Sequence, residues 1–90
     1  MEALNIFLKA LESRLHSKRG FFVPVINTIN CKFPAYKKES VEVWCIDGEY
    51  KTLISKVEVT ERMVTEEEKQ YVKEKLLKKT FKNILKYYGI

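Results

Sequence analysis

The stretch VEVWCIDGEYKTLISKVEVT, residues 41–60, decides the fold. Its first part alternates between apolar and other side chains, and its second part is again rich in β-formers. The pair Asp47-Gly48 lies between the two parts. Because an Asp-Gly pair between two such runs is a strong signal of a β-hairpin, the sequence predicts antiparallel strands over 41–46 and 50–60.

The alternation also divides the side chains of this hairpin between two faces, because neighbouring residues of a strand point to opposite sides. The face expected to lie on the core carries Val41, Val43, Cys45, Leu53, Val57 and Val59. The opposite face carries Glu42, Trp44, Ile46, Lys56, Glu58 and Thr60. Trp44 is therefore the aromatic side chain that we expect on the outer face of the sheet.

Upstream of the hairpin, residues 2–19 are predicted to form an amphipathic helix that Gly20 can end in a left-handed conformation. Its apolar stripe comprises Leu4, Phe7, Leu8, Leu11 and Leu15. Residues 21–29 are rich in β-formers, and Pro24 has no N–H to donate, so this segment is expected to be an edge strand. Residues 30–40 are polar and contain Pro34, which indicates a loop.

Downstream of the hairpin, a second helix has a well-marked start. Thr65 followed three residues later by Glu68 forms the pattern of a capping box. The apolar face predicted for this helix comprises Leu77, Phe81, Ile84 and Tyr88, widened by Leu76, Leu85 and Tyr87. The helix can extend to about residue 88, a length of roughly 34 Å at ~1.5 Å per residue.

The predicted order is therefore α-β-β-β-α, a single small α+β domain over residues 1–90. Two helices covering one three-stranded antiparallel sheet is the simplest arrangement of layers for this order. The predicted core comprises Leu4, Phe7, Leu11, Leu15, Val43, Leu53, Val57, Leu77, Phe81 and Ile84.

This order of elements resembles that of the double-stranded-RNA-binding domain. In that family a Gly-rich turn leads into Lys-Lys-x-x-Lys at the start of the last helix. The run Lys78-Lys79-Thr80-Phe81-Lys82 has this spacing, but it lies in mid-helix behind Glu66-Glu67-Glu68, and no Gly precedes it. The resemblance is one of element order and assigns no family.

The first residues lack the features of a secretory signal, because Glu2 stands where positive charge is expected and Lys9 interrupts the apolar run. No uncharged stretch approaches the ~18 residues of a membrane span.

With only Cys31 and Cys45, the chain is expected to be cytoplasmic with free thiols. Its excess of Lys over Arg fits either a thermophile or an AT-rich genome.

Positive charge is concentrated in the last helix, since residues 69–90 contain seven Lys and one Glu. At ~100° per residue, Lys75, Lys79, Lys82 and Lys86 fall within about 60° of one another, opposite the predicted apolar face. Such a row can contact DNA or RNA phosphates, or it can be an ordinary solvated face. The nucleic-acid hypothesis assigns binding to Lys75, Lys78, Lys79, Lys82 and Lys86, assisted by Lys37 and Lys38. The row contains no Arg, which argues against recognition of specific bases.

The alternative hypothesis is a protein-interaction module, either a homodimer or a partner-binding protein. It would use segment 21–29 as an edge that another strand can pair with, and Trp44 as a partner-binding residue. Trp44, Tyr36 and Phe33 could equally stack on bases, or Trp44 could be half-buried against a neighbouring strand. Small proteins of both classes occur in viruses and mobile elements.

Catalysis and cofactor binding have little support in the sequence. The only histidine is His16 and the only aspartate is Asp47, which the hairpin turn explains. His16, Cys31 and Cys45 lack the close pairing of structural zinc ligands, so we expect no metal site and no cofactor. The sequence thus predicts a protein that is not an enzyme.

Overall fold

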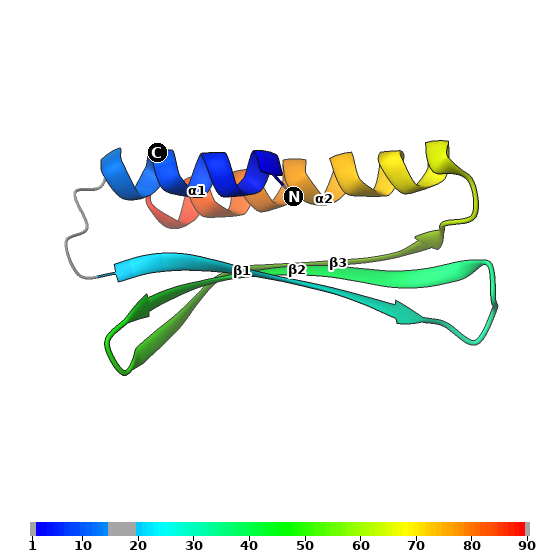
Figure 1. Ribbon diagram of the computed structural model, residues 1–90, viewed down its shortest axis with the longest axis horizontal. Coiled ribbons are helices and arrows are strands. Elements are labelled where there is room, and N and C mark those ends of the chain that lie inside the picture. The colour runs from blue at the N-terminus through cyan, green and yellow to red at the C-terminus, as the bar shows by residue number, and fades with distance from the viewer. Residues whose placement is uncertain (1, 15–19, 90) are drawn as a thin grey trace.

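The computed structural model describes residues 2–14 and 20–89 and has the predicted order of elements (Figure 1). The elements are α1 (Glu2–Arg14), β1 (Gly20–Asn30), β2 (Tyr36–Asp47), β3 (Tyr50–Arg62) and α2 (Glu66–Tyr87). The three strands form one open antiparallel sheet in the order β1-β2-β3. The prediction of an α+β domain with a three-stranded antiparallel sheet is confirmed.

The β2–β3 hairpin turns where the sequence predicts it. Asp47 pairs with Tyr50, and Gly48 begins the two-residue turn with a φ of 63°. This left-handed conformation favours glycine, because a Cβ there is strained. The pairing of β1 with β2 alone makes β1 an edge strand, as Pro24 indicates.

The predicted loop over residues 30–40 is wrong for its second half. Residues 36–40 belong to β2, because all five pair with residues 58–62 of β3 and residues 37–40 also pair with residues 27–30 of β1. Pairing on both sides thus extends the strand through a polar stretch that has no strand signal of its own. Gly20 is the first residue of β1 and lies opposite Asp47. Among the described residues α1 ends at Arg14, and Leu15 and His16 lie outside them.

A β-bulge in β3 changes which of its side chains reach the core. Val43 of β2 pairs with Ser55, but the next residue, Trp44, pairs with Leu53, so Ile54 is an extra residue. Ile54 and Ser55 are both buried, whereas Leu53 is 39% exposed. The prediction that Leu53 lies in the core is therefore wrong, because the bulge interrupts the alternation on which it rested.

Both helices lie on the same face of the sheet (Figure 1). Helix α1 packs over β1 and α2 packs mainly over β3. The buried core consists of Leu4, Leu8, Leu11, Val41, Val43, Ile54, Val57, Val59, Met63, Val72, Leu76 and Ile84. The predicted core residues Phe7, Leu77 and Phe81 are partly buried against this cluster, and the rings of Phe7 and Phe81 lie 4.5 Å apart between the two helices.

Helix α2 is anchored by a row of residues one turn apart. Val72, Leu76, Thr80 and Ile84 are its buried residues. The row differs from the predicted apolar face by including a threonine, whose hydroxyl donates a hydrogen bond to the Leu76 carbonyl at 2.7 Å. This bond satisfies the buried hydroxyl, so a polar residue is tolerated where the pattern predicts only apolar ones. The opposite side of α2 is left to solvent.

Candidate nucleic-acid interface

The outer side of α2 carries four lysines that we call the lysine face: Lys78, Lys79, Lys82 and Lys86. All four are exposed, and none forms an ion pair among the described residues. From residue 75 onward the sequence contains no acidic residue. The helix therefore presents uncompensated positive charge along its second half, as the sequence predicts.

Lys75 belongs to the same row, but its ammonium group already has a partner in the structure. Its Nζ lies 2.8 Å from Glu61 Oε1 of β3, and this hydrogen bond, together with the charge of Glu61, raises the pKa of Lys75. The same ammonium lies 5.8 Å from the centre of the Tyr71 ring, within range of a cation–π contact. Lys75 is thus less free to contact phosphate than the sequence suggests, because the pairing with Glu61 arises only in the folded chain.

Lys37 and Lys38 are not brought together with the lysine face. As neighbours in β2 they point to opposite faces of the sheet. Lys38 pairs with Glu58 at 3.3 Å on the face away from the helices, and its hydrogen bond is the main reason that the pKa of Glu58 is lowered. Lys37 lines a groove on the helix side. The two side chains therefore cannot assist one common surface.

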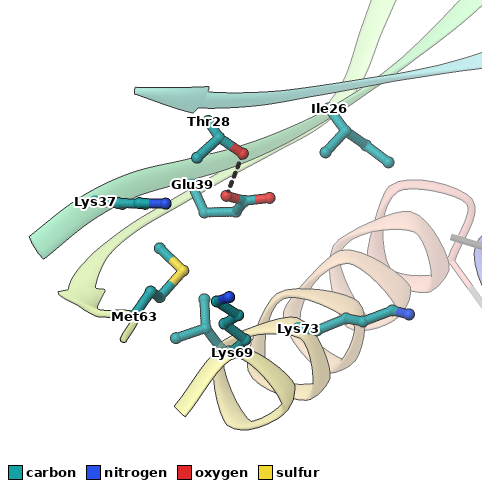
Figure 2. Close-up of a pocket in the computed structure, with 8 residues that line it drawn as sticks. Ile26, Thr28, Lys37, Glu39, Met63, Lys69 and Lys73 are labelled. Atoms are coloured by element: carbon teal, nitrogen blue, oxygen red, sulfur yellow. Dashed lines mark hydrogen bonds between the residues drawn. The ribbon is translucent and has the colours of Figure 1, made fainter. Parts of the chain in front are cut away.

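That groove lies between α2 and the far half of the sheet and has a volume of about 410 Å³. It exists because α1 has 13 residues and α2 has 22, so α2 extends beyond α1 over the sheet (Figure 1). Its lining comprises Ile26, Thr28, Lys37, Glu39, Met63, Lys69, Val72 and Lys73. Figure 2 shows Thr28 donating its hydroxyl hydrogen bond to Glu39 at 2.6 Å.

Two of the lysines that line the groove were not nominated as site residues from the sequence. Lys69 and Lys73 lie four residues apart, so they share one flank of α2, and this spacing was the available signal. Lys69 is paired with Glu66 at 3.3 Å, and Glu39 adds a negative charge to the same lining. The groove therefore carries mixed charge, in contrast to the lysine face.

Tyr71 is an aromatic residue on the side of α2 that carries the lysines, and sequence reasoning did not single it out. It is 60% exposed and lies one turn before Lys75 and two turns before Lys78, so its ring is available for stacking. Phe33 and Tyr36, the aromatics nominated from sequence, contact each other with centroids 6.5 Å apart at the β1–β2 turn. The helix that carries the lysine face thus also carries an exposed aromatic residue that differs from those nominated for stacking.

The face of the sheet away from the helices carries a second feature, which we call the open-face patch. Strand register places Phe21 beside Ile46, and Val23, Trp44 and Leu53 side by side across the three strands. Phe21 is 53% exposed, whereas Trp44 is half-buried between its neighbours and donates its indole N–H to Glu42 at 3.2 Å. The expectation that Trp44 points away from the core is confirmed, with a half-buried ring. The patch comprises Phe21, Val23, Val25, Trp44, Ile46 and Leu53.

Metal sites and membrane-spanning helices are two further features that the fold can reveal. The described residues contain no group of three or more His, Cys, Asp or Glu side chains that could hold a metal. His16, the third ligand considered, lies outside them. Within the same part of the chain, no helix has the length and apolar character needed to cross a membrane.

No protein-family model, curated protein or solved structure shows a significant match to this chain.

Proposed function

We propose that this chain is a non-enzymatic accessory protein that binds the phosphate backbone of nucleic acid through the lysine face of α2. The observation that carries the proposal is four exposed lysines on one helix, each without an ion pair among the described residues. Such charges bind polyanions by releasing condensed counterions, so most of the binding free energy is electrostatic.

The spacing of the lysines suits a phosphate backbone. The lysine face from Lys78 to Lys86 spans eight residues of helix, about 12 Å at ~1.5 Å per residue. One strand of a duplex advances ~3.4 Å along the helix axis per phosphate, so about three to four phosphates lie within this length. Tyr71 at one end adds a ring on which an unpaired base can stack. The lysine face contains no arginine, so binding should depend little on sequence.

The test is an anisotropy titration of labelled duplex and single-stranded oligonucleotides at several salt concentrations. If four phosphates are neutralised on duplex DNA, log K should fall against log salt with a slope near −3.6, from ~0.9 per contact. The double variant Lys79→Gln/Lys82→Gln should bind all sequences more weakly and reduce the slope to about −1.8.

The matched control is Lys32→Gln/Lys51→Gln, which removes the same charge from exposed positions outside α2. It should retain a slope near −3.6, and both variants should keep the wild-type circular dichroism spectrum, because exposed lysine changes usually alter stability by less than ~0.5 kcal/mol. Absence of binding at low salt, or equal weakening by the two double variants, would contradict the proposal. The open-face patch has no role in this function.

A further inference from the structure

The open-face patch lacks any cover in the described structure. Both helices lie on the other face of the sheet (Figure 1). The patch combines six apolar side chains from all three strands, and three of them belong to the edge strand β1, whose eleven residues include no charged side chain. Natural edge strands are commonly protected by charges or by cover, and contiguous exposed apolar surface commonly marks an interface.

The chain exposes more surface than a compact monomer of its mass. A folded monomer of 10.7 kDa exposes about 5,500 Å² by the usual scaling of area with mass. This chain exposes 6574 Å² and is elongated, with extents of 44 × 24 × 20 Å. The elongated shape accounts for additional surface, and a protein–protein interface of standard size buries ~800 Å² on each partner.

The charged side chains around the open-face patch indicate which kind of partner can cover it. By strand register the open face carries four basic and two acidic side chains, Lys38, Lys51, Lys56, Arg62, Glu42 and Glu58. Arg62 is paired with Glu68 of α2 at 3.4 Å. Lys38 and Lys56 both pair with Glu58. The face is therefore nearly neutral, although the whole chain has a net charge of +5. Two copies of a basic protein repel each other least across such a face, so a second copy is a suitable occupant.

Pro24 decides between the two ways in which copies could meet. Pairing of β1 with β1 of a second copy would use the backbone N–H groups along the free edge. Pro24 lies near the middle of β1 and has no N–H to donate. Packing of the two open faces needs no backbone donor, because sheets pack face to face through their side chains.

We propose that two copies of this chain form a two-fold symmetric dimer in which the open-face patches pack against each other. The sheets form the centre of the dimer and the four helices form its outer layers. Trp44 lies inside the interface, and the lysine faces of both copies remain outside, so the dimer is compatible with the proposed function but does not depend on it.

The experiment combines sedimentation velocity with the fluorescence of Trp44, the only tryptophan. With rising concentration in the micromolar range, the sedimentation coefficient should change from monomer to dimer, and Trp44 emission should shift to shorter wavelength over the same range. Leu53→Lys places a charge in the patch at a position that is 39% exposed. It should raise the dissociation constant by about 30-fold or more, as loss of an interface hot spot does.

The matched control is Ile6→Lys, which adds the same charge at a 63% exposed site on α1, away from the patch. It should leave the dissociation constant within about threefold, and thermal melts should show both variants folded. A protein that remains monomeric to about 0.5 mM would overturn the proposal. So would a dimer that forms without a shift of Trp44 emission, or one that Ile6→Lys disrupts and Leu53→Lys does not, because each places the interface elsewhere.

Discussion

At the scale of single residues, Thr65 sets the start of α2. Its hydroxyl accepts a hydrogen bond from the Glu68 backbone N–H at 3.1 Å, and Glu68 Oε1 accepts one from the Thr65 N–H at 2.9 Å. Thr65→Ala removes the capping oxygen and should lower the free energy of unfolding by ~1 kcal/mol. Urea melts measure this change, and Thr65→Ser, which keeps the oxygen, should stay within about 0.5 kcal/mol of wild type. An alanine variant as stable as wild type would contradict the assigned cap.

The same cap makes the free energy of unfolding depend on pH. The hydrogen bond from the Thr65 N–H, with help from its hydroxyl and from Arg62, lowers the pKa of Glu68 below 4.5. Because the folded state favours the charged carboxylate, its contribution is complete above pH 4.5 and is lost as pH falls through the lowered pKa. Between pH 6 and pH 3, the urea midpoint should therefore fall less for Glu68→Gln than for wild type.

At the scale of elements, the bulge in β3 decides which side chains support the core. Ile54 is 8% exposed beneath the helices, and Leu53 lies beside Trp44 on the open face. Ile54→Ala should therefore lower the free energy of unfolding by about 2–4 kcal/mol, in the range of buried Ile or Leu to Ala. Leu53→Thr should change it by less than ~1 kcal/mol in the monomer.

Urea denaturation of both variants at a concentration where wild type is monomeric measures the difference. The comparison is specific to the bulge, because a strand with unbroken alternation would place Leu53 with Val57 on the core side and Ile54 outside. A larger effect for Leu53 than for Ile54 would mean that β3 has the regular register.

At the scale of the whole molecule, the long sheet keeps the two cysteines apart. Cys45 pairs with Phe22 near the start of β1, and Cys31 follows the end of that strand. Eight residues of antiparallel strand span ~27 Å, whereas disulfide-bonded Cα atoms lie within ~7 Å. Both are free thiols in the structure, and burial is the main reason that the pKa of Cys45 is raised.

We therefore expect mass spectrometry of the native monomer to show the fully reduced mass. Mild oxidant should produce disulfides only between chains, which Cys31→Ser should reduce most, because burial and the raised pKa of Cys45 slow its oxidation. A native monomer two mass units lighter would contradict the separation of the two ends of the sheet.

The sequence by itself determined the order of the elements and the exposure of the lysine face. The hairpin at Asp47-Gly48 and the cap at Thr65 are local, because each depends on residues only a few positions apart. The side of α2 that carries Lys78 to Lys86 follows from helical periodicity, since a helix must turn its apolar side to a core. Local chemistry and periodicity are therefore sufficient for the fold class and for most of the candidate interface.

Only the tertiary structure determined the features that depend on contacts between residues distant in the sequence. The register of β2 against β3 introduces the bulge that moves Leu53 out of the core. It also places Lys37 and Lys38 inside a strand and sends them to opposite faces. The packing of α2 on β3 brings Glu61 to Lys75 across fourteen residues of sequence. No local pattern predicts these contacts, because register and packing are set by the sum of many side chains along two elements at once.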